Sequence, residues 1–184
     1  QRSNSRICKI IYYFCIFSMV IPFQMVMFTL SKLADMLKLN NPLGIVIVYL
    51  GFGAGLSVFM FCGFVKSIPL EIEEAAMIDG CTPLQTFFGI VMPIMKPTCI
   101  TVAILQTMWI WNDYLLPFLV IGNSNGVKTL TLELYFAKLT SGQYGNPWEL
   151  IFPAVLVTII PIVILYIFLQ KYIVAGVAEG VVKM

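Results

Sequence analysis

The segment EAAMIDGCTPLQTFFGIVMP, residues 74–93, has the most specific residue spacing in the chain. Glu-Ala-Ala is followed after three residues by Gly80, and after nine more by Ile-x-Met-Pro. Carboxylates beside small apolar side chains suit a noncovalent contact with a partner that has a hydrophobic groove and a basic rim. The predicted chemistry is therefore docking. The candidate docking residues are Glu71, Glu74, Ala75, Ala76, Asp79, Gly80, Ile90 and Pro93.

Covalent chemistry has little support in this sequence. There is no histidine, which removes histidine-based acid–base catalysis and the commonest zinc ligand. The five cysteines form no C-x-x-C pair, and we interpret them as small apolar residues. The chain has neither a GxxxxGK[ST] phosphate-binding loop nor a GxSxG nucleophile elbow, and Asp113 alone cannot make an aspartyl dyad. We expect no enzyme activity, metal site or cofactor here, and any ATP hydrolysis on another chain.

The first of two short helices is expected to carry most of the docking residues. Ser67 and Pro69 predict its start, and Gly80 predicts a left-handed residue at its end. A side-chain stripe lies within about 80° on this helix at ~100° per residue. Its members are Ile68, Ile72, Ala75 and Ala76, and Glu71 and Glu74 flank them.

A second helix is expected directly after the turn. Thr82 is a plausible N-cap, Pro83 suits the first helical position, and Gln85 stands where a capping box needs it. This helix is predicted to run to Pro93, and Pro97 restarts the chain into the next apolar segment. The two helices therefore meet at a fixed turn.

The composition places these elements beside a membrane. Hydrophobic residues make up 60% of the 184 residues, charged residues 11%, and the mean hydropathy is +0.94. Four stretches reach the ~20 residues that a spanning helix needs, namely residues 10–30, 42–65, 98–122 and 151–170. A soluble bundle would need a polar face on each helix, which these stretches lack. We predict an all-α integral membrane bundle that forms one domain over residues 1–184, with four spans and a cytoplasmic loop at 66–97.

Local signals add detail to the spans. Pro22 is expected to kink the first one, and residues 31–39 are expected to form a short interfacial helix. Gly51 and Gly55 have the small-xxx-small spacing that permits close helix packing. After a turn at residues 123–126, a further short helix is expected over 129–139.

The distribution of positive charge predicts the orientation. With the N-terminus inside, seven basic residues lie in the cytoplasm and four outside, as the positive-inside rule favours. The C-terminus and the docking loop are then cytoplasmic, where ATP is available. The inner residues are Arg2, Arg6, Lys9, Lys66, Lys96, Lys171 and Lys183, and the outer ones Lys32, Lys38, Lys128 and Lys138.

The third span has a polar face whose role the residues leave open. Trp109, Asn112 and Asp113 share that face, with Gln106 at its edge. An ionisable side chain near mid-span costs roughly 2.5–3.5 kcal/mol, so it normally points into a protein or water-filled interior. One interpretation is a substrate path in which Trp109 stacks on a sugar. The other is an interhelical hydrogen bond with aromatic residues at the outer interface.

The whole chain resembles the permease subunits of type I ABC importers, which have a MetI-like fold. The segment at 74–93 is similar to the EAA loop of that family at every position except Met92, where leucine is usual. Residues 111–117 (WNDYLLP), Lys128-Thr129-Leu130-Thr131 and the tail from Gln170 to Gly176 resemble the carbohydrate-uptake branch, similar to the second maltose-system permease. The ending at 179–184 departs from the usual pattern, which leaves the subfamily open.

The resemblance implies a transport subunit in the cytoplasmic membrane that works with other chains. These are a homologous permease, an ABC ATPase dimer that uses ATP and Mg, and an extracytoplasmic solute-binding protein. No nucleic-acid partner is expected. Because the family usually has about six spans, two more are expected before Gln1. An importer for amino acids, peptides or phosphate is the alternative within the family, and a secondary transporter the alternative outside it.

Overall fold

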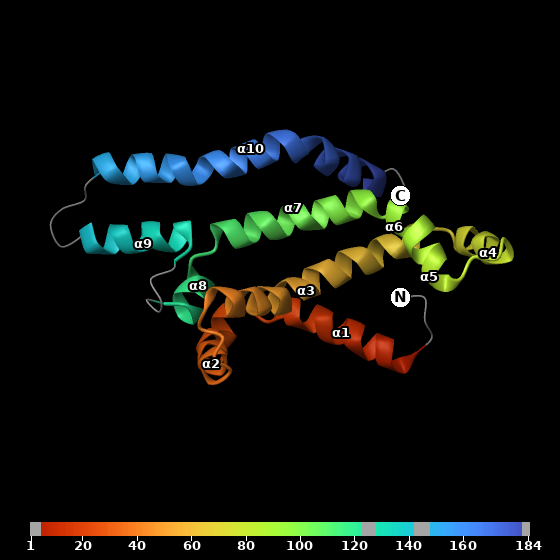
Figure 1. Cartoon of the computed structure of the whole chain (residues 1–184), viewed down its shortest axis with the longest axis horizontal. Helices are drawn as coiled ribbons and strands as arrows, with labels where there is room; N and C mark the ends of the chain where they lie inside the picture. The colour runs from red at the N-terminus through yellow and green to blue at the C-terminus, as the bar shows by residue number, and fades with distance from the viewer. Residues whose placement is uncertain (1–4, 123–127, 142–147, 182–184) are drawn as a thin grey trace. The chain divides into compact units, whose positions relative to one another are not determined.

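A computed structural model of the chain describes residues 5–122, 128–141 and 148–181, with side chains except for 139–141, 150 and 171–181. All regular elements in this part of the chain are helices (Figure 1), as predicted. In order they are α1 (Arg6–Val20), α2 (Phe23–Met36), α3 (Pro42–Ser67), α4 (Leu70–Ile78), α5 (Pro83–Thr86), the π-helix η1 (Phe87–Val91), α6 (Met92–Ile94), α7 (Lys96–Asn112), α8 (Leu115–Val120), α9 (Leu130–Ser141) and α10 (Trp148–Val181). The turn expected at residues 123–126 lies outside the described residues.

Two described helices are long and apolar enough to cross a membrane without a break. They are α3, with 26 residues, and the part Ile151–Gln170 of α10, with 20. Two further pairs reach the same criterion only when the helices on either side of a short break are taken together, α1 with α2 and the helices at Pro83–Ile94 with α7. The described part of the chain therefore has two to four candidate spans.

The first predicted span is not one kinked helix, so that expectation is wrong. The helix ends at Val20, and Pro22 has extended backbone angles (φ −60°, ψ 134°) before α2 begins at Phe23. Proline lacks the N–H that would continue the hydrogen-bond ladder, and its ring clashes with the preceding turn. The separate interfacial helix expected at 31–39 is also wrong, because residues 31–36 continue α2 and Ala34 is buried.

The third predicted span is interrupted as well. Helix α7 ends at Asn112, and α8 begins three residues later. Pro117 has no N–H to give to the Asp113 carbonyl four residues earlier, so the ladder cannot pass unbroken through this point. The expectation of one helix over residues 98–122 is therefore wrong at Asp113 and Tyr114.

The described residues group into two compact units. The first unit draws on residues 1–20, 53–105 and 170–184, and the second on 21–52 and 106–169. In the first unit Ile68, Val91 and Met95 form a buried cluster beneath aromatic residues of α3. In the second, Ala34 of α2 packs with residues of α3 and α8, and the Ser31 hydroxyl donates to the Leu119 carbonyl at 2.8 Å.

The predicted close packing at small residues holds for one of the two glycines. A Cβ atom on Gly55 would lie 2.8 Å from the Cys15 carbonyl oxygen and from Ser18 Oγ, so α1 approaches the α3 backbone directly. Gly51, one turn earlier, has no heavy atom within 4 Å of that position. Of these two glycines, only Gly55 therefore has a close-contact reason to be glycine.

Candidate functional site

The first helix of the predicted hairpin ends in a Schellman turn. Helix α4 closes with Gly80 at φ +87°, the left-handed region that glycine adopts without a Cβ penalty. The Gly80 N–H donates to the Met77 carbonyl at 3.1 Å, and the Cys81 N–H donates to the Ala76 carbonyl at 3.0 Å. The prediction for Gly80 is confirmed.

The second helix begins with the predicted capping box. The Thr82 N–H donates to Gln85 Oε1 at 2.8 Å, and the Gln85 N–H donates back to Thr82 Oγ1 at 3.4 Å, with Pro83 at the first helical position. Only Cys81 separates the left-handed Gly80 from the N-cap Thr82. Local hydrogen bonds therefore fix the reversal between α4 and α5 (Figure 1).

The course of the second helix departs from the regular α-helix expected up to Pro93. Residues Phe87–Val91 form a π-helical segment, in which the Met92 N–H donates to the Phe87 carbonyl five residues earlier. Helix α6 then ends at Ile94. The start of the first helix also differs, because the Ser67 hydroxyl donates back to the Phe64 carbonyl at 2.8 Å and does not cap α4.

The carboxylates and the apolar stripe of α4 do not share the same surroundings. Glu71, Glu74 and Asp79 are exposed, and so is Ala75. Ile68 and Ala76 are each 5% exposed, so this half of the predicted stripe packs within the unit and not against a partner. In the second helix, Ile90 is half-buried and Pro93 is exposed.

The most exposed apolar side chains of the hairpin are ones that the sequence analysis missed. Ile78, the last residue of α4, is 86% exposed, and Leu84 and Phe88 beyond the turn are 71% and 63% exposed. The signal available in the sequence was their position next to Gly80 and Thr82, since a tight turn projects the neighbouring side chains outward. The hairpin thus presents apolar side chains around its turn together with carboxylates on α4.

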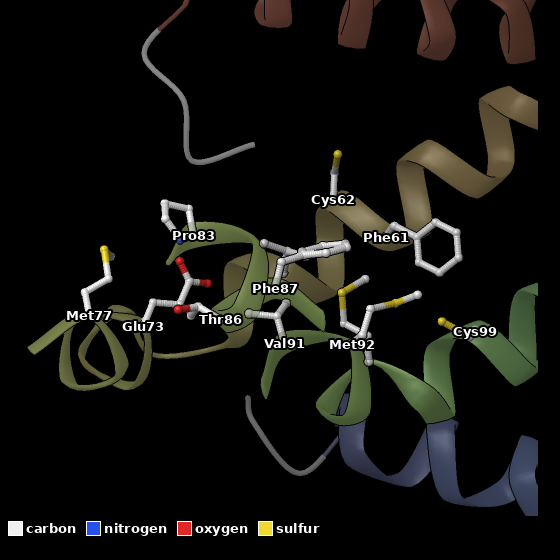
Figure 2. Close-up of a pocket in the computed structure, with 12 residues that line it drawn as sticks. Phe61, Cys62, Glu73, Met77, Pro83, Thr86, Phe87, Val91, Met92 and Cys99 are labelled. Carbon is white, nitrogen blue, oxygen red and sulfur yellow. The ribbon is translucent and has the colours of Figure 1, made fainter. Parts of the chain in front are cut away.

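Behind the hairpin lies a pocket of about 560 Å³ within the same unit. Figure 2 draws the side chains that line it, which come from the end of α3, from α4, from α5 to α6, and from the start of α7. Glu73 and Met77 of α4 lie at one end of the drawn set, and Phe61 of α3 and Cys99 of α7 lie at the other. The pocket is therefore lined jointly by the hairpin and by the ends of two apolar helices, α3 and α7.

In the second unit, Asp113 occupies the break between α7 and α8. Its Oδ1 accepts from the Leu115 and Leu116 N–H groups at 3.0 and 3.3 Å, as an N-cap does. Its Oδ2 accepts from the Tyr49 hydroxyl of α3 at 3.1 Å. Both carboxylate oxygens of Asp113 thus have partners in the second unit.

The backbone of Asp113 is held by a separate motif. In a continuous helix the Asp113 carbonyl would accept from the N–H of residue 117, but Pro117 has no N–H. The carbonyl instead accepts from the Thr131 hydroxyl of α9 at 2.9 Å. Thr129 caps α9, since its Oγ1 accepts from the Leu132 N–H at 3.3 Å. The WNDYLLP and KTLT segments, singled out separately in the sequence, therefore meet at one hydrogen bond. The helix predicted over 129–139 is confirmed as α9.

The other predicted pathway residues belong to α7, and each has different surroundings. Trp109 is 42% exposed and meets the Tyr49 ring edge-on, with centroids 5.6 Å apart. The exposed Asn112 side chain donates back to the Met108 carbonyl of its own helix at 2.7 Å, and Gln106 is half-buried. Tyr49, which touches both Trp109 and Asp113, was missed because it lies 64 residues from Asp113 in the chain.

Comparison with known families gives a match over nearly the whole chain. Residues 1–179 match the model of the family described as "Binding-protein-dependent transport system inner membrane component". That description is of a membrane component of a transport system and not of an enzyme.

Individual relatives carry names of sugar transport permeases. A probable starch degradation products transport system permease of Thermoanaerobacterium thermosulfurigenes is 40% identical over 183 residues, which cover 100% of this chain and 65% of the relative. A multiple sugar-binding transport system permease of Streptococcus mutans is 36% identical over 98% of this chain and 65% of the relative. A melibiose/raffinose/stachyose import permease of Bacillus subtilis is 40% identical over 70% of this chain and 45% of its own length. The chain thus spans just under two thirds of the length of the first two relatives.

Proposed function

Because the chain belongs to the family of binding-protein-dependent transport system inner membrane components, we propose that it is the permease subunit of an ATP-driven sugar importer. The relatives named above support a sugar or oligosaccharide as cargo. The single observation within the structure that supports the proposal most is the hairpin at residues 70–94, because a turn closed by two local caps can transmit motion without deforming.

The family supports the partners, because its description is of one component of a transport system that depends on a binding protein. A separate ATPase dimer binds ATP and Mg, a second permease completes the path, and an extracytoplasmic protein delivers the sugar. ATP binding closes the ATPase dimer and moves the docked hairpin as a rigid body. The bundle then alternates between inward-open and outward-open states around the sugar.

The docking surface consists of the apolar side chains at the turn and the carboxylates of α4. Ile78 and Leu84 enter an apolar groove of the ATPase, and Glu71, Glu74 and Asp79 face its basic rim. In the second unit, Trp109 offers an aromatic face to the sugar, with Gln106 and Asn112 for its hydroxyl groups. Asp113 positions that region through its bonds to α3 and α8.

Co-purification with the ATPase tests the docking surface. Replacing Ile78 and Leu84 together by serine should lower ATPase recovery on the tagged permease roughly tenfold, because buried apolar side chains at interface centres contribute most of the binding energy. Leu43 of α3, which is 81% exposed, provides the control, and Leu43→Ser should leave recovery unchanged. Full recovery with the double variant, or an equal loss with Leu43→Ser, would contradict the proposal.

Reconstitution tests the cargo. Proteoliposomes that contain the full-length permease and its partners should accumulate oligosaccharide only when ATP and the binding protein are present. Uptake that persists without the ATPase would indicate a secondary transporter instead.

A further inference from the structure

The residues that line the pocket behind the hairpin differ from those assigned to ATPase docking. Ten of its twelve lining residues are apolar, and five of those ten carry sulfur. Met77, Met92 and Met95 are flexible and polarizable, so they adapt to ligands of different shape. Phe61 and Phe87 add aromatic rings from two different helices. The volume of about 560 Å³ lies within the usual range for sites that bind small molecules.

Glu73 is the charged residue among those that line the pocket, and Thr86 is the other polar one. Figure 2 shows the Glu73 carboxylate at the same end of the set as Pro83 and Thr86, away from Phe61. Glu73 is half-buried, whereas the neighbouring Glu74 is exposed and does not line the pocket. From residue 67 to 95 the charged residues are Glu71, Glu73, Glu74 and Asp79, so this segment carries only negative charge.

We propose that this pocket binds a small amphipathic cation, with its apolar body among the phenylalanine and methionine side chains and its ammonium group at Glu73. The negative charge of the Glu73 carboxylate attracts the ammonium group, while the Phe61 end of the pocket, which lies away from Glu73, receives the apolar body. The same carboxylate disfavours an anionic group at the Glu73 end of the pocket.

The pocket walls indicate what such a ligand does. Glu73 and Met77 belong to α4 and Phe87 and Val91 to the π-helical segment, whereas Phe61 and Cys99 belong to the apolar helices α3 and α7. A ligand that touches all of them resists any displacement of the hairpin relative to α3 and α7. On the proposed function, it slows the coupling of ATP hydrolysis to transport. Binding itself does not depend on that function.

Thiol protection in the full-length protein tests binding directly. Two variants keep one cysteine each, with the others changed to serine: one retains Cys99, which lines the pocket, and the other retains Cys81, which is at the turn and does not. In lipid nanodiscs, 4-phenylbutyl-trimethylammonium should slow maleimide labelling of Cys99 in a saturable way and leave Cys81 unaffected. The neutral isostere, with a tert-butyl group in place of trimethylammonium, should protect Cys99 at least tenfold less well.

Replacing Glu73 and Glu74 one at a time distinguishes a specific site from a general effect of negative charge, because only Glu73 lines the pocket. Glu73→Gln should weaken protection by the cation about tenfold and leave the neutral isostere unchanged, whereas Glu74→Gln should leave both unchanged. Equal protection by the two probes, equal protection of Cys81, or an unchanged cation affinity in Glu73→Gln would each overturn the proposal. If Glu73→Gln does not assemble, the comparison of the two probes on the Cys99 variant decides alone. ATPase recovery is measured on the same samples, so a failure of docking is distinguishable from a failure of ligand binding.

Discussion

The hairpin turn and the Asp113 junction both interrupt a helix at a polar cap, but they are held in different ways. At the hairpin the hydrogen bonds join residues three to five positions apart, as in the capping box of Thr82 and Gln85 and the bond from Cys81 to Ala76. Asp113 also caps α8 locally, but its other two partners, Tyr49 and Thr131, lie 64 and 18 residues away. The hairpin can therefore keep its shape while it moves, whereas the junction keeps its shape only while α3, α8 and α9 stay together.

The largest effect is expected at Gly80. Gly80→Val places a β-branched side chain at φ +87°, which costs about 1–3 kcal/mol and should open the turn. Transport should fall roughly tenfold or more while the protein remains in the membrane. Gly89, in the same hairpin, has no heavy atom within 4 Å of a Cβ position and no positive φ, so Gly89→Val is the control. Normal substrate-stimulated ATP hydrolysis in Gly80→Val would show that the turn need not be left-handed.

At the junction, Asp113→Ala should act on stability. The substitution removes the cap of α8 and leaves the Tyr49 hydroxyl without its acceptor, a loss of about 2 kcal/mol. Tyr49→Phe removes only the second of these interactions and should cost about half as much. The thermal unfolding temperature of the purified complex measures both. Equal shifts for the two variants would mean that the cap contributes nothing.

The same contrast explains what the sequence could predict. Gly80, Thr82, Pro83 and Gln85 were identified correctly because each acts on backbone groups within one turn of the chain. Asp113 was placed on a continuous helical face, although Pro117, four residues later, already indicates that the Asp113 carbonyl lacks its helical donor. What the sequence could not reveal is that the Thr131 hydroxyl donates to this carbonyl instead. Tyr49 could not be found at all, because its role depends on a contact between helices far apart in the chain.

Burial on α4 was missed for a related reason. A helical stripe shows which side chains share a face but not what covers that face. Ile68 packs inward because it forms a buried cluster with Val91 and Met95 of the returning helix, and Ala76 is buried as well. The exposed residues Ile78 and Leu84 then become the apolar part of the docking surface.

Uptake measurements separate substrate contact from positioning in the second unit. Trp109→Ala should lower uptake of oligosaccharides several-fold, because stacking on a sugar depends on the ring itself. Asp113→Asn keeps one oxygen acceptor for α8 and should change uptake less. If Trp109→Ala transports a panel of oligosaccharides like the unmodified protein, the proposed sugar contact is wrong, and the ring serves only to pack against Tyr49.

A smaller effect is expected where α1 meets α3. Gly55→Ala brings a methyl group within 2.8 Å of the Cys15 carbonyl oxygen, so the helices must separate at a cost of about 1–2 kcal/mol. Gly51→Ala, one turn away on the same helix, meets no atom within 4 Å and should be neutral or slightly stabilising. Thermal unfolding of the two variants side by side gives the comparison. Equal shifts would contradict the close approach of α1 to Gly55.

The smallest effect is expected from the capping box. Whether this effect stays within the hairpin matters more than how large it is. Thr82→Ala removes the side-chain acceptor of the Gln85 N–H and costs about 1 kcal/mol, because the exposed backbone groups regain water as a partner. Hydrogen exchange at Gln85 should therefore become roughly fivefold faster, while amides of α8 and α9 exchange as before. Thr82→Ser keeps the hydroxyl and should restore slow exchange. A change that spread to the Asp113 junction would show that the hairpin depends on distant contacts after all. The hairpin turn and the Asp113 junction would then not differ in the way proposed, since both would depend on residues far away in the chain.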